Sequence, residues 1–177
     1  YRGAVRTSLI EACLPPLEQQ LQEDERVGAI SAGQTDGKRL QLTLPAEDDL
    51  SLALLTSLRL HGELAGRIPS DINFIQSLAG CKAQKLHWDF DPDVVRGLKR
   101  KPCSVILALE SGAMLHVFHE GLGKKVPVPL SPGDVLVFDG DVKHHGSGYA
   151  SKNTRAHLYL DVDRVVRKPN YTWGLEK

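Results

Sequence analysis

A chain of 177 residues and 19.4 kDa has the length of one ordinary domain. Hydrophobic residues make up 41% of it and charged residues 25%, which excludes a disordered, collagen-like or membrane-spanning chain. Lys and Arg together number 22, as do Asp and Glu. The resulting net charge of zero favours neither a nucleic-acid coat nor a membrane-surface binder.

The cysteines bear on the cellular compartment. Cys13, Cys81 and Cys103 are an odd number and include no C-x-x-C pair, so neither a disulfide framework nor a thiolate zinc site is indicated. We therefore expect an intracellular, reducing location, cytoplasmic or nuclear. Because the chain begins at Tyr1 rather than Met, we also expect a piece of a longer protein.

The first 70 residues read mainly as helices. Val5–Cys13 is predicted to form a short helix that ends before Pro15 and Pro16, because a residue before proline is disfavoured in the α region. Leu17–Arg26 restarts as a second helix. Arg39–Leu44 alternates with the period of a strand, and Pro45–Gly62 is predicted as a helix with an acidic first turn.

From Ile72 onward the sequence consists of short apolar runs separated by turn residues. The predicted strands are Ile72–Leu78, Lys85–Asp89, Cys103–Leu109, Met114–His119, Val126–Leu130, Asp134–Phe138 and Arg155–Val162. Pro127 and Pro129 assign their run to a sheet edge. This spacing predicts a sandwich or a jelly-roll barrel with helices packed outside. We predict a single domain over 1–177, with a helical lead-in over about 1–70 and a barrel core over about 72–163.

An H-x-D pattern carries the most specific chemistry. His87 and Asp89 are two residues apart in a predicted strand, so their side chains point to the same face. His144 lies 57 positions after His87, beyond the predicted strand Asp134–Phe138 and the D-G-D turn that follows it. Two imidazoles and one carboxylate form a facial triad with open coordination positions, an arrangement typical of non-haem Fe(II) oxygenases. The alternative is an ordinary hydrogen-bonded pair of His87 and Asp89 at the surface.

The last predicted strand adds an arginine to the same half of the chain. Its alternation places on one face Arg155, His157, Tyr159 and Asp161. A buried guanidinium requires an anionic partner, and its planar fork matches a carboxylate. A dicarboxylic co-substrate that chelates iron at one end would pair with Arg155 at the other. The alternative is a surface ion pair between Arg155 and Asp161 or Asp163.

Taken together, these motifs resemble a known family. The strings that carry the resemblance are Gln84-x-Leu86-His87-x-Asp89, Ser104-Val-Ile-Leu-Ala-Leu109, Pro132-Gly133-Asp134 with Gly140-Asp141-x-x-His144-x-Gly146, and Asn153-x-Arg155-x-His157-x-Tyr159. Over about residues 72–163 they are similar to the Fe(II)/2-oxoglutarate-dependent dioxygenase superfamily. The resemblance implies an α+β, mainly β fold, a double-stranded β-helix (a jelly-roll or cupin-like barrel) with the N-terminal helices outside.

The same resemblance implies a site and an activity. Iron would be bound by His87, Asp89 and His144, and 2-oxoglutarate by Arg155. His157 stands where family members often have a small hydroxyl residue, and it is assigned to the co-substrate with Arg155. The implied reaction uses Fe(II), 2-oxoglutarate and O₂, hydroxylates or oxidatively demethylates a substrate, and releases succinate and CO₂. The substrate is unidentified: a protein side chain, a small metabolite or a nucleobase.

Several alternatives stay open at this stage. His145 could replace His144 as the distal ligand, although the G-D-x-x-H-x-G spacing favours His144. A metal-binding cupin enzyme that does not use 2-oxoglutarate would keep the triad without needing Arg155, and a non-catalytic jelly-roll binding module would need neither. The basic run 96–101 leaves nucleic-acid contact as a less favoured reading than a solvated loop.

Three aromatic residues receive structural predictions. Trp88 alternates away from the face of His87 and Asp89, so we expect it in the core. Tyr171 and Trp173 near the end of the chain either cap the barrel or belong to a disordered tail.

Overall fold

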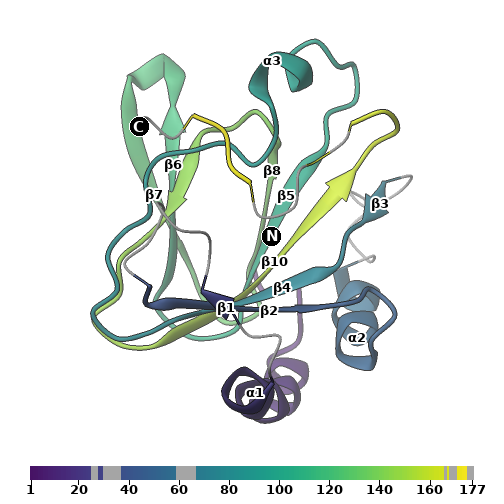
Figure 1. Cartoon of the computed structure of the whole chain (residues 1–177), viewed down its shortest axis with the longest axis vertical. Helices are drawn as coiled ribbons and strands as arrows, with labels where there is room; N and C mark the ends of the chain where they lie inside the picture. The colour runs from purple at the N-terminus through teal and green to yellow at the C-terminus, as the bar shows by residue number, and fades with distance from the viewer. Residues whose placement is uncertain (25–27, 30–36, 59–66, 166, 168–170, 175–177) are drawn as a thin grey trace.

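The computed structural model describes residues 1–24, 28–29, 37–58, 67–165, 167 and 171–174. Within these residues the chain forms two antiparallel sheets, with two helices lying outside the larger sheet (Figure 1). The larger sheet has the order β1 (Gly28–Ala29), β2 (Arg39–Leu44), β4 (Ile72–Ser77), β10 (Asn153–Asp161), β5 (Cys103–Ala108) and β8 (Val135–Asp139), with β3 (Ile68–Pro69) also pairing with β10. The smaller sheet has the order β7 (Lys124–Leu130), β6 (Ala113–His119) and β9 (His144–Gly146).

Strand β10 lies at the centre of the larger sheet and pairs with both β4 and β5. Its side chains alternate between two environments. Ala156, Leu158 and Leu160 are buried in the core beneath the helices, as the alternation of the sequence predicts. Arg155 and His157 point instead into a cavity between the sheets. One strand therefore builds the core with one face and the candidate site with the other.

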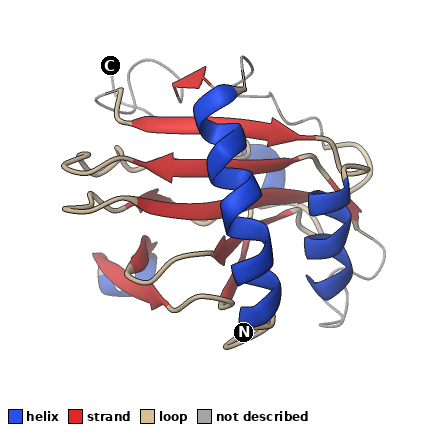
Figure 2. Ribbon diagram, turned by 90° about the horizontal axis from the view of Figure 1, so that it is seen from below, coloured by secondary structure: helices blue, strands red, loops and turns tan. Residues whose placement is uncertain are grey.

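The helices α1 (Thr7–Glu23) and α2 (Asp49–Leu58) cover the outer face of the larger sheet, and Figure 2 shows α1 running across its strands. Their buried residues join one apolar core with those of β2, β4, β5 and β10. A second cluster fills the space between the sheets and contains Ile106, Ala108, Ala113, Leu115 and Leu130. Two short helices, α3 (Pro92–Val95) and η2 (Glu120–Leu122), lie in connections. None of the described helices is long and apolar enough to cross a membrane.

The predicted break in the first helix is wrong. Helix α1 continues through Pro15 and Pro16, which are exposed, instead of ending before them. Prolines inside a helix remove backbone hydrogen bonds and cost about 3 kcal/mol or more. Here the helix gains a continuous buried face formed by Ile10, Cys13, Leu17 and Leu21. Each such side chain contributes about 1.5–3 kcal/mol on burial, so packing against the sheet outweighs the local preference.

The other predicted elements form with shifted bounds. Helix α2 begins at Asp49 rather than Pro45, where Asp48 accepts a hydrogen bond from the backbone N–H of Leu50 (3.0 Å). The predicted ends at Arg26 and Gly62 lie outside the described residues. Strand β7 is at the edge of its sheet, as its prolines predict. The run 85–89 makes isolated bridges in place of a strand, because His87 pairs with His144 whereas Trp88 pairs with Trp173.

The continuity of α1 can be tested by removing its prolines. We expect the double variant Pro15→Ala/Pro16→Ala to raise the free energy of unfolding by about 1–3 kcal/mol, because alanine restores two backbone donors in a helix interior. Urea unfolding measures this change. As a control, Pro132→Ala is expected to lower the free energy of unfolding by about 0.4–1 kcal/mol. Pro132 precedes Gly133 (φ 84°) in a tight turn, and a proline there reduces the conformational entropy of the unfolded chain. A double variant no more stable than the wild type would contradict a continuous helix.

Candidate metal centre

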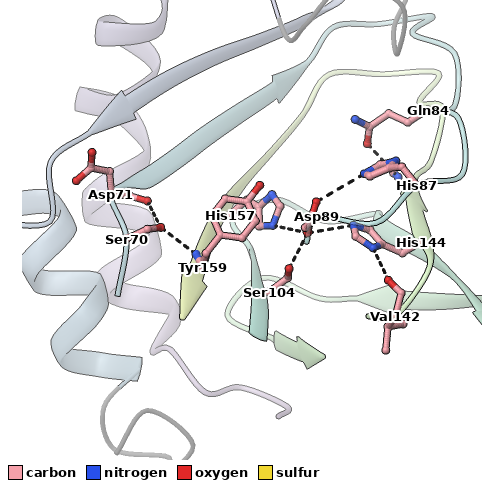
Figure 3. A network of polar contacts seen from close by, with 11 residues as sticks. Ser70, Asp71, Gln84, His87, Asp89, Ser104, Val142, His144, His157 and Tyr159 are labelled. Atoms are coloured by element: carbon pink, nitrogen blue, oxygen red, sulfur yellow. Dashed lines mark hydrogen bonds and ion pairs between the residues drawn. The ribbon is translucent and has the colours of Figure 1, made fainter. Parts of the chain in front are cut away.

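The structure brings His87, Asp89 and His144 together. One ligand atom from each residue lies within 4.8 Å of the other two, and the side chains are 3–4% exposed. Backbone pairing produces this arrangement, because His87 and His144 exchange two N–H···O=C hydrogen bonds of 3.0 and 2.9 Å. Asp89 follows two residues later and turns toward the same point (Figure 3). The side chains of His87 and Asp89 thus point to one place, as the H-x-D pattern predicts, although an isolated bridge replaces the predicted strand.

The orientation of both imidazoles suits ligation. Nδ1 of His87 lies 2.7 Å from the carbonyl oxygen of Lys85, and Nδ1 of His144 lies 3.0 Å from that of Val142. A carbonyl only accepts, so each Nδ1 carries the proton and each Nε2 has a free lone pair. The Nε2 atoms lie 3.8 and 3.4 Å from the carboxylate oxygens of Asp89. Hydrogen bonds to carbonyls that fix the tautomer in this way are typical of metal-binding histidines.

Burial sets the protonation states of the two imidazoles. Desolvation, followed by the neighbouring His144, lowers the pKa of His87 to about 4, against the opposing attraction of Asp89. Desolvation also lowers the pKa of His144, again against the attraction of Asp89. Both rings are therefore neutral at pH 7, which is the form that binds a metal.

Asp89 is held ionised by its neighbours. Burial by itself acts to raise the pKa of this carboxyl, but His144, His157 and His87 together lower it below its ordinary value. Oδ2 of Asp89 accepts a hydrogen bond of 2.6 Å from the Ser104 hydroxyl. Ser104 thereby orients the carboxylate from behind, as Figure 3 shows.

The donor set fits a divalent metal. Among the described residues no lysine or arginine lies within 4 Å of the Asp89 carboxylate, so the charge of this buried group has no fixed cationic partner in the chain. Two imidazole nitrogens and one carboxylate oxygen are the ligand set that Fe(II) takes in facial-triad sites. A divalent cation placed among the three side chains would supply the missing positive charge and leave further coordination positions open.

His145 is directed away from this cluster. Its ring stacks on that of His116, with the centroids 4.8 Å apart and the planes 11° apart, and its Nδ1 lies 3.1 Å from the Gly146 carbonyl oxygen. Because successive side chains of a strand point to opposite faces, only one of the two adjacent histidines of β9 can face His87. The structure brings His144 there and not His145, so the predicted choice of His144 as the distal ligand has a geometric basis.

Arg155 lines the same cavity and is 4% exposed. Its Nη1 donates a hydrogen bond of 3.2 Å to the hydroxyl of Ser77. No carboxylate lies within 4 Å of it in the described part of the chain, so the surface ion pair with Asp161 or Asp163 does not form. Burial lowers the pKa of the Arg155 guanidinium to about 10. This value still leaves it fully charged at pH 7, and a buried charge of this kind requires an anion.

A second arginine, Arg39, lies beside Arg155. It is completely buried, and it donates hydrogen bonds to the Ser77 hydroxyl (2.8 Å), to the Lys82 carbonyl oxygen (3.0 Å) and to the Ser147 carbonyl oxygen. Its positive charge also lowers the pKa of Arg155. Two guanidiniums that share one serine hydroxyl increase the attraction of this end of the cavity for an anion.

Gly146 makes room for both guanidiniums. A Cβ atom at this position would lie 3.2 Å from Nη2 of Arg155 and 3.3 Å from Nη1 of Arg39. It would also lie 2.5 Å from the side-chain oxygen of Gln84, which accepts a hydrogen bond from the Gly146 backbone N–H (3.0 Å). A side chain at the last glycine of the G-D-x-x-H-x-G spacing would therefore displace Gln84 and crowd both guanidiniums.

His157 lines the cavity next to the three candidate metal ligands. It lies on the cavity side of β10, and its Nε2 is 3.5 Å from Oδ2 of Asp89. The structure thus places its ring next to the carboxylate of the triad, while its predicted role in binding the co-substrate with Arg155 stays a prediction. Its ring also contacts that of Tyr159, with a centroid distance of 4.6 Å.

Sequence reasoning did not assign roles to several residues of the site. Ser104 and Gln84 belong to the strings that carry the family resemblance, which was a usable signal. Arg39 and Ser77 gave none, because they lie on β2 and β4, outside the strings that carry the resemblance. Trp88 is half-buried rather than in the core, with the Lys143 amine 4.4 Å from its ring centroid. The residues Arg167, Tyr171 and Thr172 also line the cavity.

Comparisons with known proteins establish the fold. No protein-family model matches the sequence, and no curated protein does. A Pseudomonas putida prolyl-4-hydroxylase aligns with 17% identity and a TM-score of 0.69, over 90% of this chain and 89% of its own. AviO1 from Streptomyces viridochromogenes Tue57 aligns with 15% identity and a TM-score of 0.67, over 92% and 87%.

A third solved structure is the epimerase SnoN, described in complex with Fe³⁺, alpha ketoglutarate and nogalamycin RO. It aligns with 12% identity and a TM-score of 0.70, over 96% of this chain and 80% of its own. At these identities the likeness concerns the fold. The chain has the double-stranded β-helix fold, mainly β with its helices outside, and this prediction is confirmed.

The buried imidazoles predict an acid-sensitive metal-free protein. Between pH 6.5 and about 4 the unfolded chain protonates His87 whereas the folded chain does not, so stability falls as the pH decreases. Between pH 7.5 and pH 5 a single histidine of this kind lowers the free energy of unfolding by about 2 kcal/mol. We expect His87→Gln to reduce the pH-dependent loss by about that amount, measured by urea unfolding in the presence of a chelator. His119→Gln is the control for removing a surface histidine, and a His87→Gln variant with the wild-type pH dependence would contradict the interpretation.

Proposed function

We propose that this protein is an Fe(II)- and 2-oxoglutarate-dependent dioxygenase. The observation that carries the proposal is that one cavity is lined both by His87, Asp89 and His144 and by a buried Arg155 with no carboxylate partner among the described residues. A facial triad alone would suit other metal enzymes. A buried guanidinium in the same cavity adds the recognition of a carboxylate.

Different residues of the chain would bind the iron and the 2-oxoglutarate. His87, Asp89 and His144 would hold the iron, and Arg155 would pair with the distal carboxylate of 2-oxoglutarate. When bound, iron and 2-oxoglutarate supply the chemistry that activates O₂ and oxidises a C–H bond, with release of succinate and CO₂. Ser104 orients Asp89, the carbonyl oxygens of Lys85 and Val142 orient the histidines, and Ser77 with Arg39 orients Arg155.

The expected reaction is hydroxylation or oxidative demethylation of a substrate that is not identified. A protein side chain, a small metabolite and a nucleobase are the candidate classes. Among the structural neighbours, one is a prolyl-4-hydroxylase and another, SnoN, is described with the small metabolite nogalamycin RO. These favour neither of the first two classes over the other, and the proposal includes no membrane partner. Nucleic-acid contact remains the less favoured reading.

A reducing, intracellular location is part of the proposal. The three cysteines are buried and carry free thiols, which supports a cytoplasmic or nuclear protein. Such an environment also keeps iron in the Fe(II) state that the proposed reaction uses.

Anaerobic titration of the Fe(II)-loaded protein with 2-oxoglutarate tests the proposal. We expect a visible charge-transfer band in the wild type and none in His87→Ala, because the variant lacks a ligand. Arg155→Gln is expected to need at least about tenfold more 2-oxoglutarate, because a charge-assisted pair is lost.

His145→Gln is the matched control for the adjacent histidine that faces away from the cluster, and it is expected to keep the wild-type band. Iron binding without a band in the wild type would favour a metal-binding cupin enzyme that does not use 2-oxoglutarate. An absence of iron binding would favour a jelly-roll binding module.

A further inference from the structure

The cavity has a third charged residue that neither the triad nor the co-substrate uses. Arg167 lines it together with Tyr171 and Thr172, all from the segment that follows β10. The guanidinium carbon of Arg167 lies 3.8 Å from the ring centroid of Tyr159. Tyr159 in turn contacts His157, whose Nε2 lies 3.5 Å from Asp89. Two aromatic rings therefore separate Arg167 from the candidate metal centre.

Within the described structure Arg167 has no acidic partner. No carboxylate lies within 4 Å of its guanidinium, and its Nε is buried without a hydrogen-bond acceptor. Asp161 is the acidic group that it influences, but the two do not form an ion pair, and Oδ1 of Asp161 is itself buried without a hydrogen-bond partner. The contact with the Tyr159 ring holds the guanidinium in place and leaves its Nη donors available to a ligand.

The charges of the cavity make this arginine distinctive. Its charged lining residues in the described chain are Asp89, Arg155 and Arg167. A divalent iron, Asp89, Arg155 and the doubly negative 2-oxoglutarate together carry no net charge. Arg167 then adds a positive charge that neither the metal nor the co-substrate compensates, and Asp161, the acidic group that it influences, does not form an ion pair with it. In a partly enclosed site such a charge attracts an anion more strongly than in water.

Residues 171–174 pack against Trp88, the residue between two of the candidate metal ligands. Trp173 and Trp88 exchange two backbone hydrogen bonds of 3.1 and 2.9 Å, and Trp88 stands between the ligands His87 and Asp89. The ring of Tyr171 lies 5.1 Å from that of Trp173 and is 48% exposed. Gly174 follows with φ 75°, and a Cβ there would lie 2.2 Å from the Trp88 ring. This close packing holds residues 171–174 beside the cavity, which Arg167 also lines.

We propose that Arg167 binds an anionic group, a carboxylate or a phosphate, of the substrate, with Tyr171 contacting the adjoining apolar part. The inference rests on the proposed function, because it identifies the substrate class of the same site. It makes Arg167 a specificity-determining residue: a substrate with its anion on this guanidinium reaches past Tyr159 toward the metal.

The chain supplies its own probe for the test. Its two tryptophans, Trp88 and Trp173, form the bridge beside Arg167, so tryptophan fluorescence reports ligands at this position. Benzoate and phenyl phosphate are titrated against uncharged benzamide, using the Fe(II)-loaded protein under anaerobic conditions with saturating 2-oxoglutarate to occupy Arg155. We expect saturable binding of at least one anion and much weaker binding of benzamide. The tighter of the two anions identifies the group as carboxylate or phosphate.

Variants assign the binding to the residue. Arg167→Gln is expected to weaken anion binding by about tenfold or more, and Arg167→Lys by less, because it keeps the charge but loses the planar fork. Arg6→Gln is the matched control, because Arg6 is an exposed arginine that lines neither this cavity nor the pocket next to it that Arg164, Arg167 and Trp173 share, and it is expected to leave the affinity unchanged.

Equal affinity for benzamide and the anions, or full affinity in Arg167→Gln, would overturn the proposal. The charge-transfer band of the same sample reports separately on the proposed function. A missing band with Arg167-dependent anion binding would reject the dioxygenase and retain the anion site. A normal band with anion binding that does not depend on Arg167 would retain the dioxygenase and reject the anion site.

Discussion

The central strand β10 has to satisfy two opposite environments, and the rest of the structure depends on this constraint. On one face it places Ala156, Leu158 and Leu160 against the helices in an apolar core. On the other it places Arg155 and His157 in a cavity beside the candidate metal centre. Because the strand is hydrogen-bonded on both sides, to β4 and β5, a slip of one residue would bury the charges in the core and expose the apolar side chains. The core therefore fixes the position of the site.

The site itself is organised around two buried charges that lack a partner of opposite charge within the part of the chain that the structure describes. Asp89 is ionised beside His87 and His144, and Arg155 has no carboxylate within 4 Å among these residues. Isolated buried charges cost several kcal/mol each and persist where a ligand compensates them. A divalent metal compensates the first and a dicarboxylate the second. The opposite signs at the two ends of one cavity thus favour a ligand that chelates the metal and reaches the guanidinium.

The sequence was sufficient for the features that depend on local periodicity. The alternation of β10 and the two-residue spacing of His87 and Asp89 predicted which side chains share a face. It failed where distant packing decides. Helix α1 passes through Pro15 and Pro16 because the sheet buries its apolar face, and Arg39 enters the site from a strand without any motif. The sequence did not predict Arg167 in the cavity and left Tyr171 either capping the barrel or in a disordered tail, because no local pattern reveals the pairing of Trp88 with Trp173.

The most direct test of the proposed site is a crystal structure of the protein grown anaerobically with Fe(II) and 2-oxoglutarate, with the iron located by its anomalous scattering. We expect one iron bonded to Nε2 of His87, Nε2 of His144 and an oxygen of Asp89. We also expect the distal carboxylate of 2-oxoglutarate on the guanidinium of Arg155. An iron bound elsewhere, for example at His116 and His145, or a co-substrate that does not contact Arg155, would contradict the proposed site.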